Sequence, residues 1–297
     1  MTPFKSGIVF LVDIVLMIAI QLFLALNPDA GGLSLAGGVL LSESICIVPA
    51  CFFAIIFSAK AREAFRFNYV KPSTFAFTAL MVLLLNPLLS ALNAFTMLFT
   101  DNVAALEGAK IVNEGLPKMV FVLAVIAPLA EELLFRGVIL SGLRNGKPIL
   151  SAIILQAVMF GFMHMNLNQM LYAIALGVFN GFLIEVTDSI WPCVFAHAMV
   201  NLFSVIGLFA LPEDEISDLV SRGGDREELI LTFAVTSCVS VLTTALAGCT
   251  VVRIAKNEPG GMDRLRQIFR KNEGKRVMSI PAFAGLAISL TMVAMNL

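Results

Sequence analysis

The stretch Pro117–Gly142 reads PKMVFVLAVIAPLAEELLFRGVILSG, and it combines the two features that decide the fold class. It is long and apolar enough to cross a bilayer, because a spanning helix needs about 20 mostly apolar residues. It also holds two adjacent carboxylates, Glu131 and Glu132, and one guanidinium, Arg136. Ionisable groups inside a spanning segment are costly and usually mark a functional site. The stretch therefore predicts a membrane helix that carries a polar site.

The composition of the whole chain extends this interpretation beyond one helix. Hydrophobic residues make up 59% of the 297 residues and charged residues only 14%, whereas soluble domains carry about 25% charge. The mean hydropathy is +0.91. We therefore predict an all-α, polytopic transmembrane helical bundle of about eight or nine spans, built as a single integral-membrane domain over residues 1–297. The lipid bilayer is the expected partner, and a net charge of −1 predicts no nucleic-acid partner.

Apolar segments of spanning length recur along the chain and define the candidate spans. They are Gly7–Leu26, Val39–Ser58, Thr74–Leu98, Pro117–Gly142, Ile149–His164, Leu167–Val186, Ile190–Leu211, Leu229–Val252 and Val277–Asn296. Eight spans is the alternative if one terminal segment lies in the membrane interface instead of crossing it.

The placement of lysine and arginine predicts the orientation of these spans. If the N-terminus is cytoplasmic, 16 of the 20 basic residues fall in cytoplasmic segments. We therefore predict a cytoplasmic N-terminus and an external C-terminus, in the plasma membrane of a prokaryote. Residues 253–276 then form a basic cytoplasmic loop. Within it, Met262–Arg276 has the pattern of an amphipathic helix lying on the anionic leaflet, although anchoring by positive charge alone explains the same residues.

Small residues and one proline predict local packing near the polar segments. Ala173, Gly177 and Gly181 are spaced four apart, which allows a neighbouring helix to approach the sixth span closely. Pro128 lacks a backbone N–H and displaces the carbonyl four residues earlier. We therefore expect the helix to be loosened one turn before Glu131.

The two glutamates are predicted to play different parts. Glu132 and Arg136 are four residues apart, so they share a helix face and can pair. Arg136 lies toward the predicted cytoplasmic end, where its head is expected to reach water. Glu131 points about 100° away from that pair and stays available. The alternative is that both glutamates belong to one structural ion-pair network.

Two further pairs of residues stand out because they contain the only histidines of the chain. Phe160 and His164 share one helix face, and so do His197 and Asn201. Each has a simpler explanation, such as a satisfied core histidine, an interhelical amide, or an aromatic that sets the orientation of the His164 ring. Taken with Glu131, however, they are the groups needed to activate water and to stabilise an oxyanion.

Helical rise does not place these side chains at one depth. At about 1.5 Å per residue, Glu131 and His197 lie roughly 15 Å and 10 Å from the cytoplasmic helix ends, but His164 lies nearer 20 Å. A single site requires the fifth span to be tilted or to start deeper. We predict that the three side chains meet within about 8 Å in a hydrated cavity, using the same rise.

Three motifs in this order resemble those of the CPBP intramembrane proteases. They are Glu-Glu-x-x-x-Arg at Glu131–Arg136, Phe-x-x-x-His at Phe160–His164 and His-x-x-x-Asn at His197–Asn201. That family includes the type II CAAX-processing proteases and the bacteriocin-processing or self-immunity (Abi) proteins. The resemblance implies a catalytic core within residues 117–211, and the spans on either side of it carry no motif that matches.

The resemblance also implies a role for each motif residue. Glu131 would be the general base, and His164 would hold or polarise the water. His197 and Asn201 would donate to the oxyanion. The supporting or substrate-binding residues would be Glu132, Arg136 and Phe160. The expected reaction is hydrolysis of a peptide bond in a membrane-associated or prenylated peptide or protein, reached from the cytoplasmic side.

Other chemistries remain open at this point. We expect no metal cofactor, but zinc bound by Glu131, His164 and His197 with water as the fourth ligand is the alternative. A non-catalytic bacteriocin-immunity or regulatory membrane protein of the same fold would keep the residues without the reaction. A proton-coupled transporter could use them as a relay, but the chain shows no internal repeat. The sequence predicts neither the particular substrate nor the oligomeric state.

Overall fold

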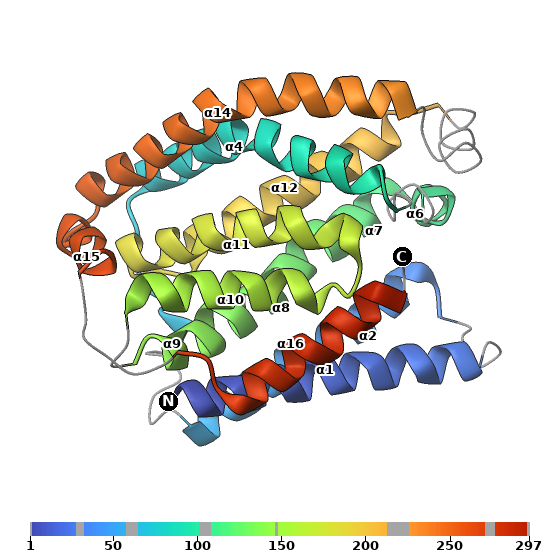
Figure 1. Ribbon diagram of the computed structural model, residues 1–297, viewed down its shortest axis with the longest axis horizontal. Helices are drawn as coiled ribbons and strands as arrows, with labels where there is room; N and C mark the ends of the chain where they lie inside the picture. Colours follow the sequence, from blue (N-terminus) through green and yellow to red (C-terminus); the bar gives the residue numbers. More distant parts are fainter. Residues whose placement is uncertain are drawn as a thin grey trace.

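The computed structural model describes residues 2–27, 33–57, 65–100, 108–145, 148–212, 226–270 and 277–295, and all regular structure in these ranges is helical (Figure 1). The helices are α1 (Pro3–Leu26), α2 (Leu35–Phe57), α4 (Pro72–Met97), α6 (Gly108–Glu114), α7 (Leu116–Phe121), η2 (Val122–Ile126), α8 (Ala127–Glu132), η3 (Leu133–Ile139), α9 (Leu140–Leu143), α10 (Ile149–Met163), α11 (Leu167–Thr187), α12 (Trp191–Phe209), α14 (Arg226–Asn257), α15 (Gly261–Ile268) and α16 (Ile280–Met295).

Within the described ranges, each predicted span corresponds to a helix or to a continuous run of helices. Six helices are long and apolar enough to cross a membrane by themselves: α1, α2, α4, α11, α12 and α14. The shorter apolar helices α10 and α16 and the run from α7 to α9 account for the others. The predicted class, a polytopic helical membrane protein, is confirmed.

The predicted basic loop differs from the structure at its start. Residues 253–257 are the last turn of α14, which continues five residues past Val252. The predicted amphipathic helix is present as α15, but it ends at Ile268, and residues 271–276 lie outside the described ranges. The sequence pattern missed the extension because the polar residues of the last turn, such as Arg253 and Lys256, look like a loop.

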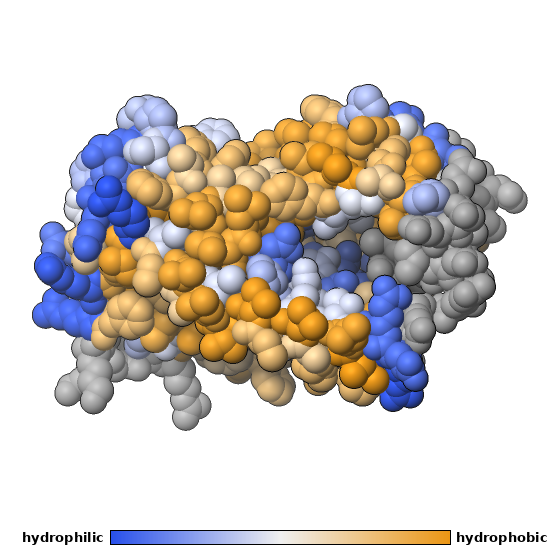
Figure 2. All heavy atoms as spheres, turned by 90° about the horizontal axis from the view of Figure 1, so that it is seen from above, coloured by the Kyte–Doolittle hydropathy of each residue, from blue (hydrophilic) through white to orange (hydrophobic). Residues whose placement is uncertain are grey.

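The long helices run side by side and alternate in direction, so the two termini lie at opposite ends of the bundle (Figure 1). Opposite ends are what an odd number of crossings requires. One end, which we call the basic end, holds the start of α1, the start of α4 and the helix α15. Hydrophilic side chains gather there, and hydrophobic side chains cover the middle of the molecule (Figure 2). The described basic residues of this end are Lys5, Arg66, Lys71, Arg144, Arg253, Lys256, Arg264, Arg266 and Arg270.

Two exposed aromatic residues accompany these charges. Tyr69 is 81% exposed just before α4, and Trp191 is 42% exposed at the first residue of α12. Aromatic side chains of this kind are enriched where a membrane protein meets the membrane–water interface. The basic end therefore has the composition of a bilayer surface. Which surface it faces stays a prediction from charge alone.

Glycines hold α10 and α11 close together, as the spacing of small residues predicted. A Cβ at Gly177 would lie 3.0 Å from the Cα of Ala157, and one at Gly181 would lie 2.7 Å from Ile153 Cγ2. Gly161 is tighter still, because a Cβ there would lie 2.6 Å from the backbone oxygen of Met170. Only a residue without a side chain allows this approach, and it fixes the position of the α10 face that carries Phe160 and His164.

The run from α7 to α9 contains two widened turns that flank the acidic pair. In η2 the backbone N–H of Ala127 bonds to the carbonyl of Val122, five residues back, immediately before Pro128. In η3 the N–H of Leu140 bonds to the carbonyl of Phe135 with the same spacing. The loosening expected next to Pro128 thus takes the form of a π-helical turn, a feature that often occurs at functional sites.

Candidate active site

One carboxylate oxygen, Glu132 Oε1, gathers three partners from three helices. Arg136 Nη1 lies 2.9 Å from it, His197 Nδ1 lies 3.0 Å from it, and Asn180 Nδ2 donates to it at 3.0 Å. Glu132 and Arg136 both have no exposed surface. The predicted i, i+4 pair is therefore present, and it ties the α8–η3 segment to α11 and α12.

Arg136 does not reach water, so that part of the sequence prediction was wrong. Its side chain is fully buried and its guanidinium carbon lies 4.4 Å from the centre of the Phe160 ring. The ion pair with Glu132 and the aromatic face hold the charged head inside the bundle. Helix position alone suggested snorkelling, because it could not show that Phe160 of α10 lies across from the guanidinium.

Glu131 is the glutamate left without a cation of its own. It is 8% exposed, and its Oε2 has no hydrogen-bond partner within the described part of the chain. The same oxygen lies 3.8 Å from His197 Nε2. This separation is too long for a direct hydrogen bond, but one water molecule can bridge two polar atoms at such a spacing. The two adjacent glutamates therefore have distinct surroundings, as predicted.

The proton positions on both imidazoles follow from their partners. His197 Nδ1 faces the ion-paired carboxylate of Glu132, which only accepts, so Nδ1 carries the hydrogen. His164 Nδ1 lies 3.0 Å from the carbonyl oxygen of Phe160, which also only accepts. Each neutral ring then presents Nε2 as an acceptor. A neutral His197 can hold the hydrogen of a water through this atom, and it can donate from Nε2 only as an imidazolium.

Phe160 brings the two histidines together. Its ring centre lies 5.3 Å from that of His164 and 5.6 Å from that of His197, and both contacts are edge-to-face. The aromatic residue therefore does more than orient His164, because it also contacts the imidazole of His197. His164 follows the 15-residue helix α10, and the α10–α11 turn stops short of the ends of α4 and α14 (Figure 1). The short hairpin explains why His164 lies within the bundle.

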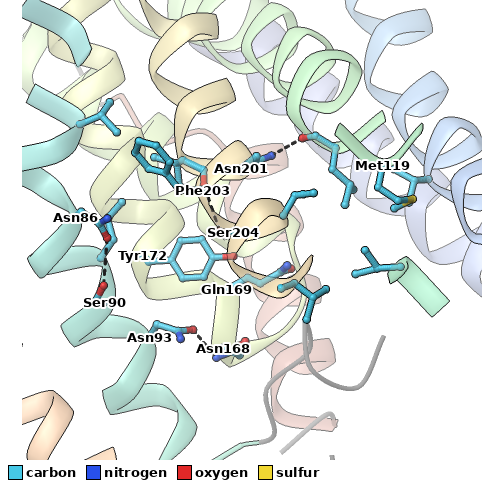
Figure 3. Close-up of a pocket in the computed structure, with 18 of the residues that line it drawn as sticks. Asn86, Ser90, Asn93, Met119, Asn168, Gln169, Tyr172, Asn201, Phe203 and Ser204 are labelled. Carbon is cyan, nitrogen blue, oxygen red and sulfur yellow. Dashed lines mark hydrogen bonds between the residues drawn. The ribbon is translucent and has the colours of Figure 1, made fainter. Parts of the chain in front are cut away.

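Asn201 lies one helical turn beyond His197 and faces a cavity. Its Nδ2 donates to the backbone carbonyl of Leu123 in η2 at 2.8 Å (Figure 3). An asparagine amide has two N–H donors, and the second has no partner among the residues the structure describes. Asn201 thus joins α12 to the widened turn before Pro128 and keeps one donor available.

The cavity has a volume of about 570 Å³ and lies between α4, α11 and α12, with α2, α6 and α7 closing it (Figure 3). Asn201 lines it. Glu131, His164 and His197 are not among its lining residues. The predicted common hydrated pocket is therefore realised only in part. The motif side chains cluster in the core, and the open space begins one turn away from them.

The position of this cavity bears on the expected direction of access, which stays a prediction. Its lining residues come from the second half of α4, the second half of α12 and the first turns of α11. All three segments lie toward the end opposite the basic end (Figure 1). If the basic end is cytoplasmic, the cavity is in the outer half of the membrane, so it does not provide access from the cytoplasmic side. The distribution of lysine and arginine predicts the orientation in the membrane, but it contains no information on where a cavity lies between the helices.

Several polar residues at or near this site were missed by the motif analysis. Asn180 of α11 holds Glu132, and Tyr172 of the same helix lines the cavity. Asp13 of α1 is fully buried, and neither of its carboxylate oxygens has a hydrogen-bond partner in the described ranges. The signal that could have found all three is the one used for Glu131, namely a polar residue inside an apolar span.

The zinc alternative requires the side chains of Glu131, His164 and His197 to converge on one metal ion. Among the described residues, no group of three or more His, Cys, Asp or Glu side chains is placed to hold a metal ion. Glu131 and His197 are close, but His197 Nδ1 is engaged by Glu132, and His164 Nδ1 is engaged by the carbonyl of Phe160. Independence from metal stays a prediction.

The fold and site define a class: a multi-pass helical membrane protein with a buried carboxylate–imidazole cluster. Residues 113–203 match the family model described as Type II CAAX prenyl endopeptidase Rce1-like. A Bacillus subtilis (strain 168) protein named "Putative membrane peptidase YdiL" is 35% identical over 95 residues, which is 32% of this chain and 39% of that relative. The chain thus aligns with about two fifths of the relative's length. No solved structure matches. Through this central segment, the chain is similar to the CPBP family of membrane peptidases.

Proposed function

We propose that this protein is an intramembrane endopeptidase that hydrolyses a peptide bond with water activated by Glu131. The observation that carries the proposal is the pairing of Glu131 Oε2 with His197 Nε2 across 3.8 Å, while Arg136 neutralises the neighbouring Glu132. One carboxylate is thereby left free beside an imidazole whose orientation is fixed. The similarity of residues 113–203 to CPBP peptidases supports the same chemistry.

The proposed reaction begins with a water held between Glu131 and His197. Glu131 takes one proton from this water, His197 Nε2 orients the other hydrogen, and the oxygen attacks the carbonyl carbon of the peptide. Asn201 donates its second N–H to the oxyanion that forms. When the C–N bond breaks, the proton on Glu131 passes to the leaving nitrogen. His164, whose ring also contacts Phe160, contributes a second acceptor through Nε2.

Glu132 and Arg136 act on this reaction through His197. Because both are fully buried, they are positioning residues rather than substrate contacts. Glu132 holds the imidazole in one tautomer and one orientation, as the aspartate of a serine protease triad does. Arg136 keeps Glu132 charged and in place. The substrate proposed is a membrane-associated or lipidated peptide, in keeping with a site inside the bundle.

The test uses the purified protein in liposomes, a panel of membrane-associated peptides and mass spectrometry of the products. We expect Glu131→Gln, which keeps the shape of the side chain, to lower the cleavage rate by about 10²- to 10⁴-fold, the usual contribution of a general base. Glu228→Gln, at an exposed glutamate of α14, is the matched control and should cleave normally.

Two results would overturn the proposal. Cleavage by Glu131→Gln at the normal rate would remove Glu131 from the mechanism. Failure of the wild-type protein to cleave any peptide that it binds would favour a non-catalytic member of the fold. A parallel sample treated with a strong chelator, with zinc measured in the same preparation, tests the metal-independent form, and loss of activity together with zinc would assign the water to the metal.

A further inference from the structure

The cavity beside the motif residues has a wall of uncharged polar side chains at membrane depth. Residues of α4 lie along one side of it, Met119 lies on the other, and Tyr172 lies between them (Figure 3). None of the described residues that line the cavity is charged. Eight of them are polar, and the others are apolar. The polar residues are Asn86, Ser90, Asn93, Asn168, Gln169, Tyr172, Asn201 and Ser204.

The polar wall sets a requirement on whatever fills the cavity. A polar group away from water is costly unless it is hydrogen-bonded. Some of the demand is met internally, because Asn168 Nδ2 donates to Asn93 Oδ1 at 2.9 Å and Ser90 Oγ donates to Asn86 Oδ1 at 3.2 Å. The Asn86 amide accepts from Ser90 through Oδ1 and still has its two N–H donors to offer. An acyl or prenyl chain would leave them unpaired, whereas a peptide backbone offers N–H and C=O groups to pair with.

The lack of charge in the wall restricts the occupant further. A charged side chain or a free terminal carboxylate would enter the cavity without a counter-ion. The lysine next to the lining residue Met119, Lys118, is engaged at 2.6 Å by Glu114. That hydrogen bond from Lys118 lowers the pKa of the Glu114 carboxyl, and the opposite charges of this ion pair at the rim of the cavity offset each other. The chemistry therefore favours an internal, uncharged stretch of polypeptide.

The polar wall also reaches a side of the bundle that faces the bilayer. Asn86 and Ser90 line a second, shallower depression of about 340 Å³ between α4 and α14. Leu83 in the same depression is 55% exposed. Figure 2 shows a hollow with hydrophilic surface inside it and hydrophobic surface along part of its edge. A segment lying in the bilayer can therefore meet the first hydrogen-bonding residues of the wall from the side.

The remaining step is the distance to the reacting groups. Asn201 in the wall and His197 in the core are separated by one turn of α12, about 6 Å of helical rise. Leu123, whose carbonyl holds Asn201, lines the cavity as well. A backbone held against the wall at Asn201 thus lies about one helical turn from His197.

We propose that this cavity binds an internal, uncharged segment of a membrane-associated polypeptide in extended form, with its backbone hydrogen-bonded by Asn86, Ser90 and Ser204. The volume of about 570 Å³ lies in the usual range of ligand sites, about 300–1,000 Å³. This inference rests on the proposed peptidase function and names its substrate class as a neutral stretch of chain. A free carboxyl terminus or a lipid group is not what the wall recognises.

The experiment measures binding without cleavage, in full-length Glu131→Gln protein reconstituted in liposomes. Three photoreactive probes are compared: an apolar uncharged peptide with blocked ends and a central diazirine, the same peptide with a central aspartate, and a farnesyl chain with a diazirine but no peptide. Mass spectrometry maps the labelled residues. We expect the neutral peptide to label the 86–93 and 201–208 segments and to label them at least about fivefold more than either other probe, the equivalent of one hydrogen bond.

Two substitutions and a matched control sharpen the assignment. Asn86→Leu and Ser204→Ala should each lower this labelling by about fivefold, and in the active protein each should raise KM while kcat changes little. Ser204 Oγ donates to the carbonyl of Val200, four residues back, and Thr291 Oγ1 makes the same type of bond to Ala287 on α16. Thr291→Val therefore removes a comparable hydroxyl away from the cavity and should change nothing.

The outcomes separate this inference from the proposed function. If peptides are cleaved but the labels map elsewhere, or the aspartate peptide labels equally, the inference is wrong and the peptidase stands. Stronger labelling by the farnesyl probe would assign the cavity to a lipid group and also overturn the inference. If the neutral peptide labels the cavity and the wild-type protein cleaves nothing, the site is a peptide-binding site and the peptidase proposal fails.

Discussion

At the scale of single residues, the site depends on one oxygen atom. Glu132 Oε1 contacts Arg136, His197 and Asn180 at a fully buried position. Because Glu132 makes these structural contacts, the adjacent Glu131 is not needed for them. A buried ion pair of this kind adds little net stability, but removing one partner leaves an uncompensated charge. Its effect is therefore one of orientation, because it fixes the ring of His197.

The ion pair gives a stability prediction. Arg136→Met should lower the free energy of unfolding by about 3–5 kcal/mol, because it leaves the Glu132 carboxylate buried without a cation. Adding Glu132→Gln removes that charge, so the double variant should be more stable than Arg136→Met alone. Unfolding in detergent, followed by circular dichroism, measures both. A double variant less stable than the single one would mean that the pair is not coupled as the geometry indicates.

Asn201 gives an activity prediction. Asn201→Ala should lower kcat by about 10²- to 10³-fold, the usual cost of losing one oxyanion donor. Asn27→Ala is the matched control, because the Asn27 amide also donates to a backbone carbonyl, that of Phe23, at the exposed end of α1. Steady-state cleavage and melting temperature are measured for both. If Asn201→Ala lowers the melting temperature and leaves kcat unchanged, the amide is a structural link to Leu123.

At the scale of elements, the site depends on how closely α10 and α11 approach and on the widened turns of the fourth span. The glycines of the α10–α11 contact leave no room for a methyl group, so α10 cannot shift without moving Phe160. The π-helical turns lie on either side of the acidic pair: η2 ends just before Pro128, and η3 contains Arg136. These elements determine where each motif residue points.

Glycine substitutions test the α10–α11 contact. A Cβ at Gly161 would lie 2.4 Å from Ile174 Cγ1, whereas one at Gly207 in α12 would meet nothing within 4 Å. Gly161→Ala should therefore destabilise the protein by about 1–3 kcal/mol through overpacking. Gly207→Ala should be neutral or stabilising by up to about 1 kcal/mol, because alanine favours helix. The melting temperature should fall in Gly161→Ala and should stay the same or rise in Gly207→Ala. Equal shifts in the two variants would contradict the packing described.

At the scale of the whole molecule, the bundle has a basic end and a cavity toward the other end. Charge bias predicts that the basic end is cytoplasmic, which puts the cavity in the outer half of the membrane. Fusion of alkaline phosphatase after Leu297 should then give an active, external enzyme, and a fluorescent protein at the same place should stay dark. The same fusions at the N-terminus should report the reverse. An inactive phosphatase at the C-terminus would mean that the orientation is the reverse of the predicted one. The cavity would then be in the cytoplasmic half of the membrane.

Much of this arrangement could be predicted from local sequence, and the failures have a common cause. The spans, the Glu132–Arg136 pair, the distortion at Pro128 and the close packing at Gly177 follow from the spacing of residues within one helix. The burial of Arg136 was missed because Phe160 comes from another span. The cavity and its polar wall were missed because Asn86, Tyr172 and Ser204 are far apart in sequence and belong to no motif.

The sequence by itself determined the class of protein, because apolar length and helical periodicity are local properties, and a span of about 20 apolar residues has few alternatives in a bilayer. It also pointed to the candidate catalytic residues, since ionisable groups inside a span are costly and usually mark a functional site. Only the tertiary structure decided that Glu131 faces His197, that Asn201 faces the cavity and that the cavity lies away from the basic end. Those facts depend on how helices distant in sequence pack together, which is set by side-chain volumes at the contacts between helices.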